Sequence, residues 1–173
     1  MKNAGFTVRR GEILGFYGLV GSGRSEMIRS VMGLDKWTGG RVFFNGKQVR
    51  FKNIRQAIRH GIVLVPEERR RQGLVMSMTI RQNSTMNRLK GFLRMGLINR
   101  KKEAESVREL IDSLKIACRG VAQKVGDLSG GHQQKVVLSK YLATPVNVFV
   151  FDQPTRRIAV GPQTESSTLV DEV

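Results

Sequence analysis

The stretch from Asp127 to Lys135, which reads DLSGGHQQK, constrains this chain more than any other part of its 173 residues. A serine hydroxyl and two glycine amides stand directly before a run whose apolar residues have helical spacing, namely Val136, Val137, Leu138, Leu142 and Ala143. The N-terminus of a helix offers unpaired N–H groups and partial positive charge to an anion. The stretch therefore predicts a helix that packs on the core and presents an anion-binding turn. Taken alone, it is also compatible with a serine N-cap after a flexible turn.

A second glycine-rich segment, Gly18–Ser25, reads GLVGSGRS and lies between an apolar stretch, residues 12–17, and a helical run, residues 25–32. Its spacing is that of a phosphate-binding P-loop, GxxxxGK[ST], in which Lys contacts the terminal phosphates and the hydroxyl binds magnesium. Ser25 keeps the hydroxyl, whereas Arg24 replaces the Lys with a planar guanidinium. The candidate nucleotide-binding residues are Gly18, Gly21, Ser22, Gly23, Arg24, Ser25 and Glu26. In isolation, this variant loop is equally compatible with an ordinary glycine turn.

The third motif is a β-branched and aromatic run, residues 146–151, which predicts a buried strand of a parallel sheet. Asp152 follows at its carboxyl end, where it would bind Mg²⁺ together with Ser25.

In their order along the chain, and with the flanking residues GHQQKVVLSKYLAT, the three motifs resemble ATP-binding-cassette (ABC) ATPases. The match is to the ATP-binding subunits of bacterial sugar importers of the ribose, galactose and xylose type. The resemblance implies an α/β P-loop cassette with a mostly parallel core sheet, an N-terminal β hairpin portion and an inserted helical subdomain. It also implies ATP and Mg²⁺ as cofactors. In such proteins the LSGG signature closes on ATP held by a second cassette, a role that falls here on Leu128, Ser129, Gly130, Gly131 and Gln133.

Several residues depart from the pattern of an efficient ATPase. Gln153 stands where the family carries the Glu that deprotonates water, and loss of a general base slows turnover by about 10²- to 10⁴-fold. Glu67 occupies the position of the Q-loop glutamine. Arg24 and Glu67 match the second, C-terminal cassette of these importers, whereas Arg157 and Ala159 match neither cassette. The resemblance thus implies an ABC-type ATPase whose own hydrolysis is impaired and which supplies its signature to a partner cassette.

The domain organisation predicted for residues 1–173 is a single partial nucleotide-binding domain, incomplete at both ends. Residues 6–8 and 12–17 are expected to flank an Arg-Arg-Gly turn, and residues 12–17 form the strand before the glycine-rich loop. A hairpin is expected at residues 41–49 around Asn45-Gly46, and a short helix at residues 53–60 that ends at Gly61. The helical subdomain is expected at about residues 78–125. One of its helices has an apolar face made of Ala104, Val107, Leu110, Ile111 and Leu114.

The net charge of +16, from 30 Lys and Arg against 14 Asp and Glu, suggests nucleic acid or an anionic membrane surface as a partner. The densest basic runs are Arg69–Arg71 and Arg100–Lys102. No aromatic residues alternate with these basic residues, which disfavours nucleic acid. A nucleic-acid- or ribosome-associated ABC module and a non-functional fragment stay as alternatives to the importer.

Composition excludes several other classes. A single cysteine, Cys118, rules out an internal disulfide framework, and His60 and His132 lack metal-ligand spacing. No apolar run reaches the length of a membrane span, and the N-terminus lacks the apolar core of a signal peptide. The resemblance implies a peripheral protein on the cytoplasmic face of the bacterial inner membrane. Its partners would be a second cassette, permease subunits and, indirectly, a periplasmic sugar-binding protein.

Overall fold

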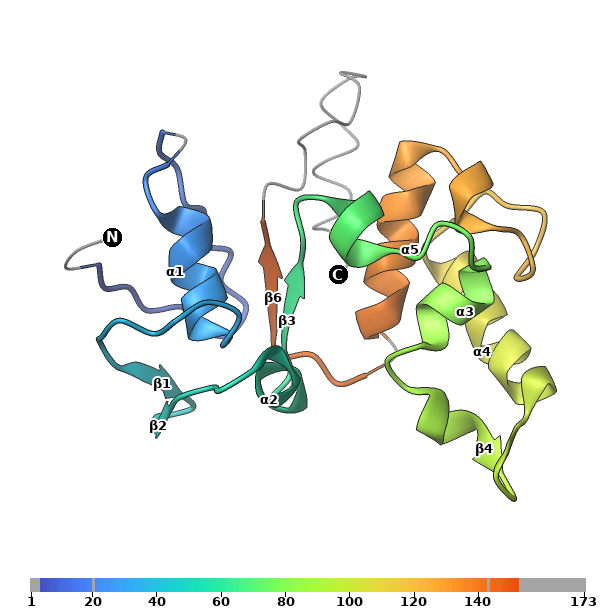
Figure 1. Ribbon diagram of the computed structural model, residues 1–173, viewed down its shortest axis with the longest axis horizontal. Helices are drawn as coiled ribbons and strands as arrows, with labels where there is room; N and C mark the ends of the chain where they lie inside the picture. The colour runs from blue at the N-terminus through green and yellow to red at the C-terminus, as the bar shows by residue number, and fades with distance from the viewer. Residues whose placement is uncertain (1–3, 20, 143, 153–173) are drawn as a thin grey trace. The chain divides into compact units, whose positions relative to one another are not determined.

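The computed structural model describes residues 4–19, 21–142 and 144–152 (Figure 1). It divides into two compact units, Met1–Ile62 and Val63–Val173. The expected α/β organisation with a parallel sheet and an inserted helical portion is confirmed.

The first unit contains two helices and one hairpin: α1 (Arg24–Val31), β1 (Val42–Phe44), β2 (Lys47–Val49) and α2 (Ile54–Arg59). The hairpin is antiparallel and turns at Asn45-Gly46, where both residues have positive φ, 50° and 75°. Asn-Gly supplies the two positive φ angles that a tight hairpin turn requires. The Asn53 side chain accepts a hydrogen bond from the Gln56 N–H and starts α2. The predicted hairpin and short helix are both confirmed.

A close backbone approach ties α1 to the start of α2. Gly33 follows α1 with φ of 72°, and a Cβ there would lie 2.6 Å from the backbone nitrogen of Asn53. Only glycine fits this position, because any side chain would overlap the backbone of the neighbouring segment. Met32 and Ala57 are fully buried beside this contact.

The strand predicted at residues 12–17 is wrong, whereas the turn expected between residues 8 and 12 is present. Residues 4–19 contain a turn at Arg10-Gly11 but no strand, although the turn brings the rings of Phe6 and Phe16 to 4.8 Å. Ile13 and Tyr17 are 79% and 103% exposed. A strand exists only as part of a ladder, and none of the described residues pairs with this segment.

β3 (Ile62–Val65), which starts at the last residue of the first unit, pairs with β6 (Val148–Phe151) in a two-stranded sheet. The two strands run in the same direction in Figure 1, and the Asp152 N–H donates to the Val65 carbonyl over 3.0 Å. β3 is completely buried, whereas β6, which was predicted to be buried, is half-buried. Residues far apart in the sequence therefore end side by side at one edge.

Short and long helices follow β3: η1 (Arg69–Gly73, a π-helix), α3 (Ile80–Thr85), η2 (Leu89–Phe92), α4 (Arg100–Ser113), η3 (Val125–Asp127) and α5 (Gly130–Leu142). Thr79 and Gln82 form a capping box at α3, and Asn99 caps α4. On α4 the predicted apolar face is buried at Ala104 and Val107, with Leu114 just beyond the helix.

A second hairpin interrupts the helical subdomain that was predicted at about residues 78–125. It consists of β4 (Leu93–Arg94) and β5 (Leu97–Ile98), joined by Met95-Gly96. Both turn residues have positive φ, 51° and 80°. The helical prediction failed here because methionine is a helix former and gives no turn signal.

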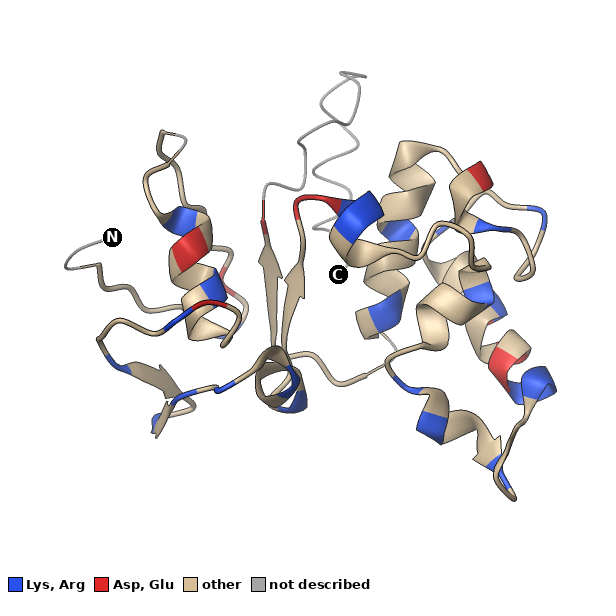
Figure 2. Ribbon diagram, viewed as in Figure 1, with Lys and Arg blue, Asp and Glu red and all other residues tan. Residues whose placement is uncertain are grey.

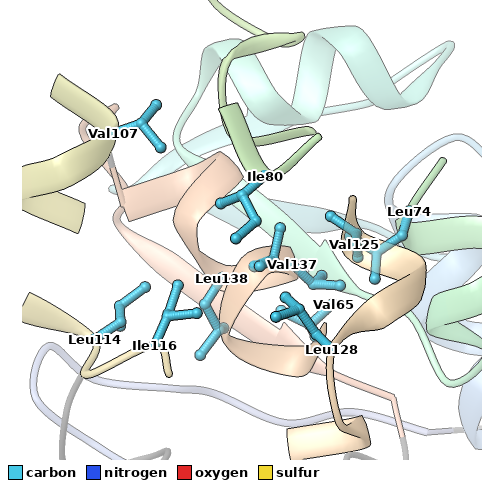
Figure 3. Packing of buried hydrophobic residues seen from close by; sticks show 11 residues of the cluster. Val65, Leu74, Ile80, Val107, Leu114, Ile116, Val125, Leu128, Val137 and Leu138 are labelled. Carbon is cyan, nitrogen blue, oxygen red and sulfur yellow. The ribbon is translucent and has the colours of Figure 1, made fainter. Parts of the chain in front are cut away.

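One hydrophobic core unites the second unit. Figure 3 shows side chains from β3, α3, α4 and α5 packed around Val137 and Leu138, together with loop residues. The labelled members are Val65, Leu74, Ile80, Val107, Leu114, Ile116, Val125, Leu128, Val137 and Leu138. Because α5 contributes three completely buried residues, the core fixes the position of its N-terminal turn. In the part of the chain that the structure describes, no helix combines the length and apolar character of a membrane span.

Candidate nucleotide-binding and signature sites

The glycine-rich loop ends where α1 begins, as its sequence predicts. Gly21 and Gly23 have φ of 82° and 87°, and Gly23 is the N-cap of α1. The Ser22 N–H donates to the Leu19 carbonyl over 3.1 Å. The loop therefore leads directly into a helix N-terminus, the arrangement that binds phosphate.

The Arg24 side chain folds back onto the glycine-rich loop. Its Nη2 lies 3.4 Å from the Leu19 carbonyl, to which it donates. Ser25 follows on the first turn of α1 and is half-buried, and Glu26 is exposed on the same turn. The guanidinium thus stays over the loop that would hold phosphate.

The signature segment turns from core to surface within a few residues. Leu128 is buried in the core, Ser129 is exposed, and α5 begins at Gly130. The buried Leu128 side chain anchors the turn in the core, and the exposed Ser129 hydroxyl lies at the N-terminus of α5. A ligand anion approaching Ser129 would meet the hydroxyl and the first N–H groups of the helix.

Gln133 supports the signature turn from inside. It is fully buried, and its amide nitrogen donates to the carbonyls of Leu128 (2.9 Å) and Val125 (3.3 Å). Its side-chain oxygen accepts from Arg69 Nε over 3.4 Å. These bonds hold η3 and the signature turn against α5. Whether Gln133 also contacts a partner's nucleotide stays a prediction.

Arg69 is a neighbour of the signature that sequence reasoning missed. Its Nη2 lies 2.6 Å from the place that a Cβ on Gly130 would occupy. Burial and the adjacent Arg70 lower the pKa of Arg69. The sequence shows Arg69 only as one of three consecutive arginines, so nothing marked it as the one that lies beside LSGG.

The contact between η1 and α5 continues beyond Arg69. The Lys140 ammonium donates to the Gly73 carbonyl, and a Cβ on Gly73 would lie 3.1 Å from a methyl of Val137. Burial lowers the pKa of Lys140 from 10.5 to about 8. The segment that carries Glu67 is thereby followed at once by a helix that packs on the signature helix.

Acidic residues follow the ends of both β3 and β6. Asp152 directly follows β6, and Glu67 lies two residues beyond the end of β3. Figure 2 shows acidic segments at the adjoining ends of both strands. The carboxyl edge of a parallel sheet is where open α/β folds bind ligands. Oxygen donors of this kind suit Mg²⁺, which proteins commonly bind with one or two carboxylates and substrate phosphates. Among the described residues, no cluster of three or more His, Cys, Asp or Glu is suited to a metal by itself.

The predicted residues divide between the two units. The P-loop residues Gly18–Ser25 and Glu26 belong to the first unit, whereas Glu67, the signature and Asp152 belong to the second. The proximity of Ser25 to Asp152 and the separation of Ser25 from Ser129 therefore stay predictions. Gln153, Arg157 and Ala159 lie outside the described residues.

Comparison with protein-family models matches residues 1–156 to the family described as "ABC transporter". The arabinose import ATP-binding protein AraG of Paraburkholderia xenovorans is 46% identical over 94% of the chain and 32% of its own length. The ribose import ATP-binding protein RbsA of Chelativorans sp. is 43% identical over 98% of the chain and 34% of its own length. The chain thus spans about a third of these relatives.

Two solved structures have the same fold. The first is the dimeric ABC transporter cassette MJ0796, with a TM-score of 0.72 and 22% identity over 96% of this chain and 70% of its own. The second is cbiO1 from Clostridium perfringens, part of the ABC transporter complex cbiONQ. Its TM-score is also 0.72, with 21% identity over 96% of this chain and 62% of its own.

Proposed function

This chain belongs to the ABC transporter family, and we propose that it is an ATP-binding cassette of a bacterial carbohydrate importer. The observation that supports the sugar-import branch most directly is identity of 46% and 43% to arabinose and ribose import ATP-binding proteins over nearly the whole chain. Such identity covers all three motifs rather than the glycine-rich loop alone.

The proposed nucleotide site is the glycine-rich loop, with the metal ligands that the resemblance to ABC ATPases implies. Backbone N–H groups where the glycine-rich loop enters α1 would bind ATP phosphates, and Arg24 would add positive charge beside them. The Ser25 hydroxyl and the Asp152 carboxylate would hold Mg²⁺, which neutralises charge on the phosphate oxygens when it is bound. Gly18, Ser22 and Glu26 complete the set of predicted contacts.

The signature is proposed to serve a second cassette rather than its own nucleotide. Three observations support this role: Ser129 is exposed, it stands at the N-terminus of α5, and Leu128 and Gln133 fix the turn from the buried side. Gly130 and Gly131 would let the backbone approach a γ-phosphate closely.

We further propose that this cassette is the second of a pair and hydrolyses ATP poorly. Gln153 replaces the carboxylate that would accept a proton from water, and Glu67 replaces the Q-loop amide. An amide orients water by hydrogen bonding but is no base near neutral pH. In such a pair, ATP would be hydrolysed mainly at the site of the partner cassette. Permease subunits and, through them, a periplasmic sugar-binding protein would complete the assembly at the cytoplasmic face of the inner membrane.

Calorimetry with MgATP, paired with a phosphate-release assay on the same chain, tests the nucleotide part of this proposal. We expect weak, Mg²⁺-dependent binding that Ser25→Ala reduces, with turnover well below about 1 per second. Turnover at or above that rate that Ser25→Ala abolishes would refute poor hydrolysis. Absence of any Mg²⁺-dependent binding, in a chain that unfolds cooperatively, would contradict the nucleotide site itself.

A further inference from the structure

The β4–β5 hairpin exposes four large apolar side chains, of which Leu93 and Ile98 share one face and Leu97 lies on the other. Leu93 pairs with Ile98, Arg94 pairs with Leu97, and Met95-Gly96 forms the turn. Met95 is 96% exposed and Leu97 is 76% exposed, with Leu93 and Ile98 at 48% and 43%. Apolar side chains this exposed and this close together are unusual on a soluble surface and mark an interaction site.

The turn of this hairpin has an unfavourable residue at a position of positive φ, whereas the other hairpin of the chain has a favourable one. At the first turn position, Asn45 has φ of 50° and Met95 has φ of 51°, and a glycine with positive φ follows each. Asparagine tolerates positive φ, whereas a bulky side chain is disfavoured there. Met95 is thus unfavourable both for the backbone and for solvation. A residue that breaks a local rule without a structural gain points to function.

Positive charge surrounds the apolar tip. Between Arg69 and Lys102 the chain has no Asp or Glu. Five exposed basic residues lie on or beside the hairpin: Lys90, Arg94, Arg100, Lys101 and Lys102. The last three form the first turn of α4, where the helix dipole disfavours cations. Figure 2 shows the blue segments near β4 and the start of α4.

Contacts at its base hold the hairpin on the helical unit. Phe92 is 5% exposed and lies under the guanidinium of Arg88, 5.0 Å from its ring centre. The Asn99 N–H donates to the Phe92 carbonyl over 2.8 Å, which closes the hairpin. The apolar tip therefore projects from an anchored base.

From this combination we propose that the β4–β5 hairpin binds the surface of an anionic phospholipid bilayer. Met95 and Leu97 enter the boundary between headgroups and acyl chains, and the five basic residues contact lipid phosphates. A lipid surface fits better than nucleic acid, because the exposed tip is aliphatic and the one aromatic residue of the hairpin region, Phe92, is buried. This inference stands apart from the nucleotide-binding role.

Vesicle flotation of the full chain tests the proposal, with phosphatidylglycerol–phosphatidylcholine vesicles compared with pure phosphatidylcholine. We expect binding to the anionic vesicles only, and weaker binding as salt rises. Met95→Asn gives the turn the residue of the other hairpin and should reduce binding about tenfold. Lys101→Gln combined with Lys102→Gln should reduce it about fivefold per charge. Phe43→Ser, an exposed apolar residue on the other hairpin, is the matched control and should bind like wild type.

Thermal unfolding of the same variants separates lost binding from lost folding. Met95→Asn and the double Gln variant remove locally unfavourable residues, so both should unfold at or above the wild-type temperature. Equal binding by all variants, equal binding to pure phosphatidylcholine, or no vesicle binding by a folded wild-type chain would overturn the proposal. Retention on duplex DNA without retention on vesicles would also overturn it and would assign the basic face to nucleic acid.

Discussion

Arg69 and Gln133 join the segment that follows β3 to the first turn of α5, with the Arg69 Nε donating to the Gln133 side-chain oxygen over 3.4 Å. Gln133 in turn donates to the carbonyls of Val125 and Leu128. One buried side-chain amide therefore holds the LSGG turn in place. Replacement of Gln133 by Leu removes the donor to the Leu128 carbonyl, whereas the Val125 carbonyl keeps its bond from the Leu128 N–H at 3.2 Å. We expect a loss of about 1–3 kcal/mol in the free energy of unfolding, measured by urea titration.

Arg69→Ala is the matched comparison for that variant. It removes a partly exposed donor and leaves both carbonyl bonds of Gln133 in place, so the expected loss is below about 1 kcal/mol. Equal stabilities for Gln133→Leu and wild type would mean that the signature turn is held by other contacts.

A second prediction concerns the buried carboxylate of α4. Glu103 is 4% exposed, accepts from the Thr85 hydroxyl over 2.7 Å and lies 3.4 Å from Arg81 Nε. Glu103→Ala leaves the half-buried guanidinium without its acid, which should lower the free energy of unfolding by about 3 kcal/mol. Glu105→Ala, on the exposed side of the same helix, should change it by less than about 0.5 kcal/mol. Similar losses from both variants would show that the contact with Arg81 is unimportant.

Lys140 gives the chain a pH dependence of stability with a definite sign. Burial lowers the pKa of Lys140 from 10.5 to about 8. Between about pH 8 and pH 10.5 the unfolded chain binds a proton that the folded chain has released, so the free energy of unfolding rises with pH. Below pH 8 the penalty for burying the charge is complete and constant.

Urea unfolding at pH 7 and pH 10 measures this rise. Lys140→Met should remove the rise in the free energy of unfolding between the two pH values. Loss of the bond to the Gly73 carbonyl would lower the free energy of unfolding equally at both. Lys101→Met keeps Lys140 and should retain the rise. A Lys140→Met profile parallel to wild type would assign the pH dependence to other groups.

The sequence was most informative where local chemistry dictates local structure. Asn45-Gly46 required a hairpin, Asn53 capped α2, and the spacing after LSGG predicted α5. These features depend on residues close in sequence, whose turn and capping preferences are strong. Helices and turns of this kind were therefore predicted correctly.

Features that depend on tertiary context were missed. The apolar residues 12–17 read as a strand, but a strand requires a partner that periodicity does not supply. Met95 has no turn propensity, so the second hairpin was hidden within a helical pattern. The position of Arg69 beside Gly130 arises from the packing of η1 on α5, and no spacing rule distinguishes it from Arg70 or Arg71.

A further prediction concerns Gln153, where a carboxylate introduced by Gln153→Glu should raise the rate of ATP hydrolysis only partly. Gln153→Glu supplies a general base, but Arg24 and Glu67 still depart from the pattern of an efficient ATPase. We expect an increase in phosphate release of less than about tenfold, against the 10² to 10⁴ that a base contributes in a complete site. The double variant Gln153→Glu, Arg24→Lys should exceed the single one. A full recovery from Gln153→Glu alone would locate the whole defect at that residue.

The central claim is that this cassette's signature serves a partner's ATP during sugar uptake. The most direct measurement is uptake of radiolabelled arabinose or ribose by cells whose complete importer subunit carries Gly130→Asp or Ser129→Ala within this cassette. Aspartate at Gly130 would displace Arg69 and place negative charge against the γ-phosphate, and Ser129→Ala removes the exposed hydroxyl. The account predicts that Gly130→Asp abolishes uptake and that Ser129→Ala reduces it at least about tenfold, at unchanged subunit abundance. Wild-type uptake by Gly130→Asp would contradict it.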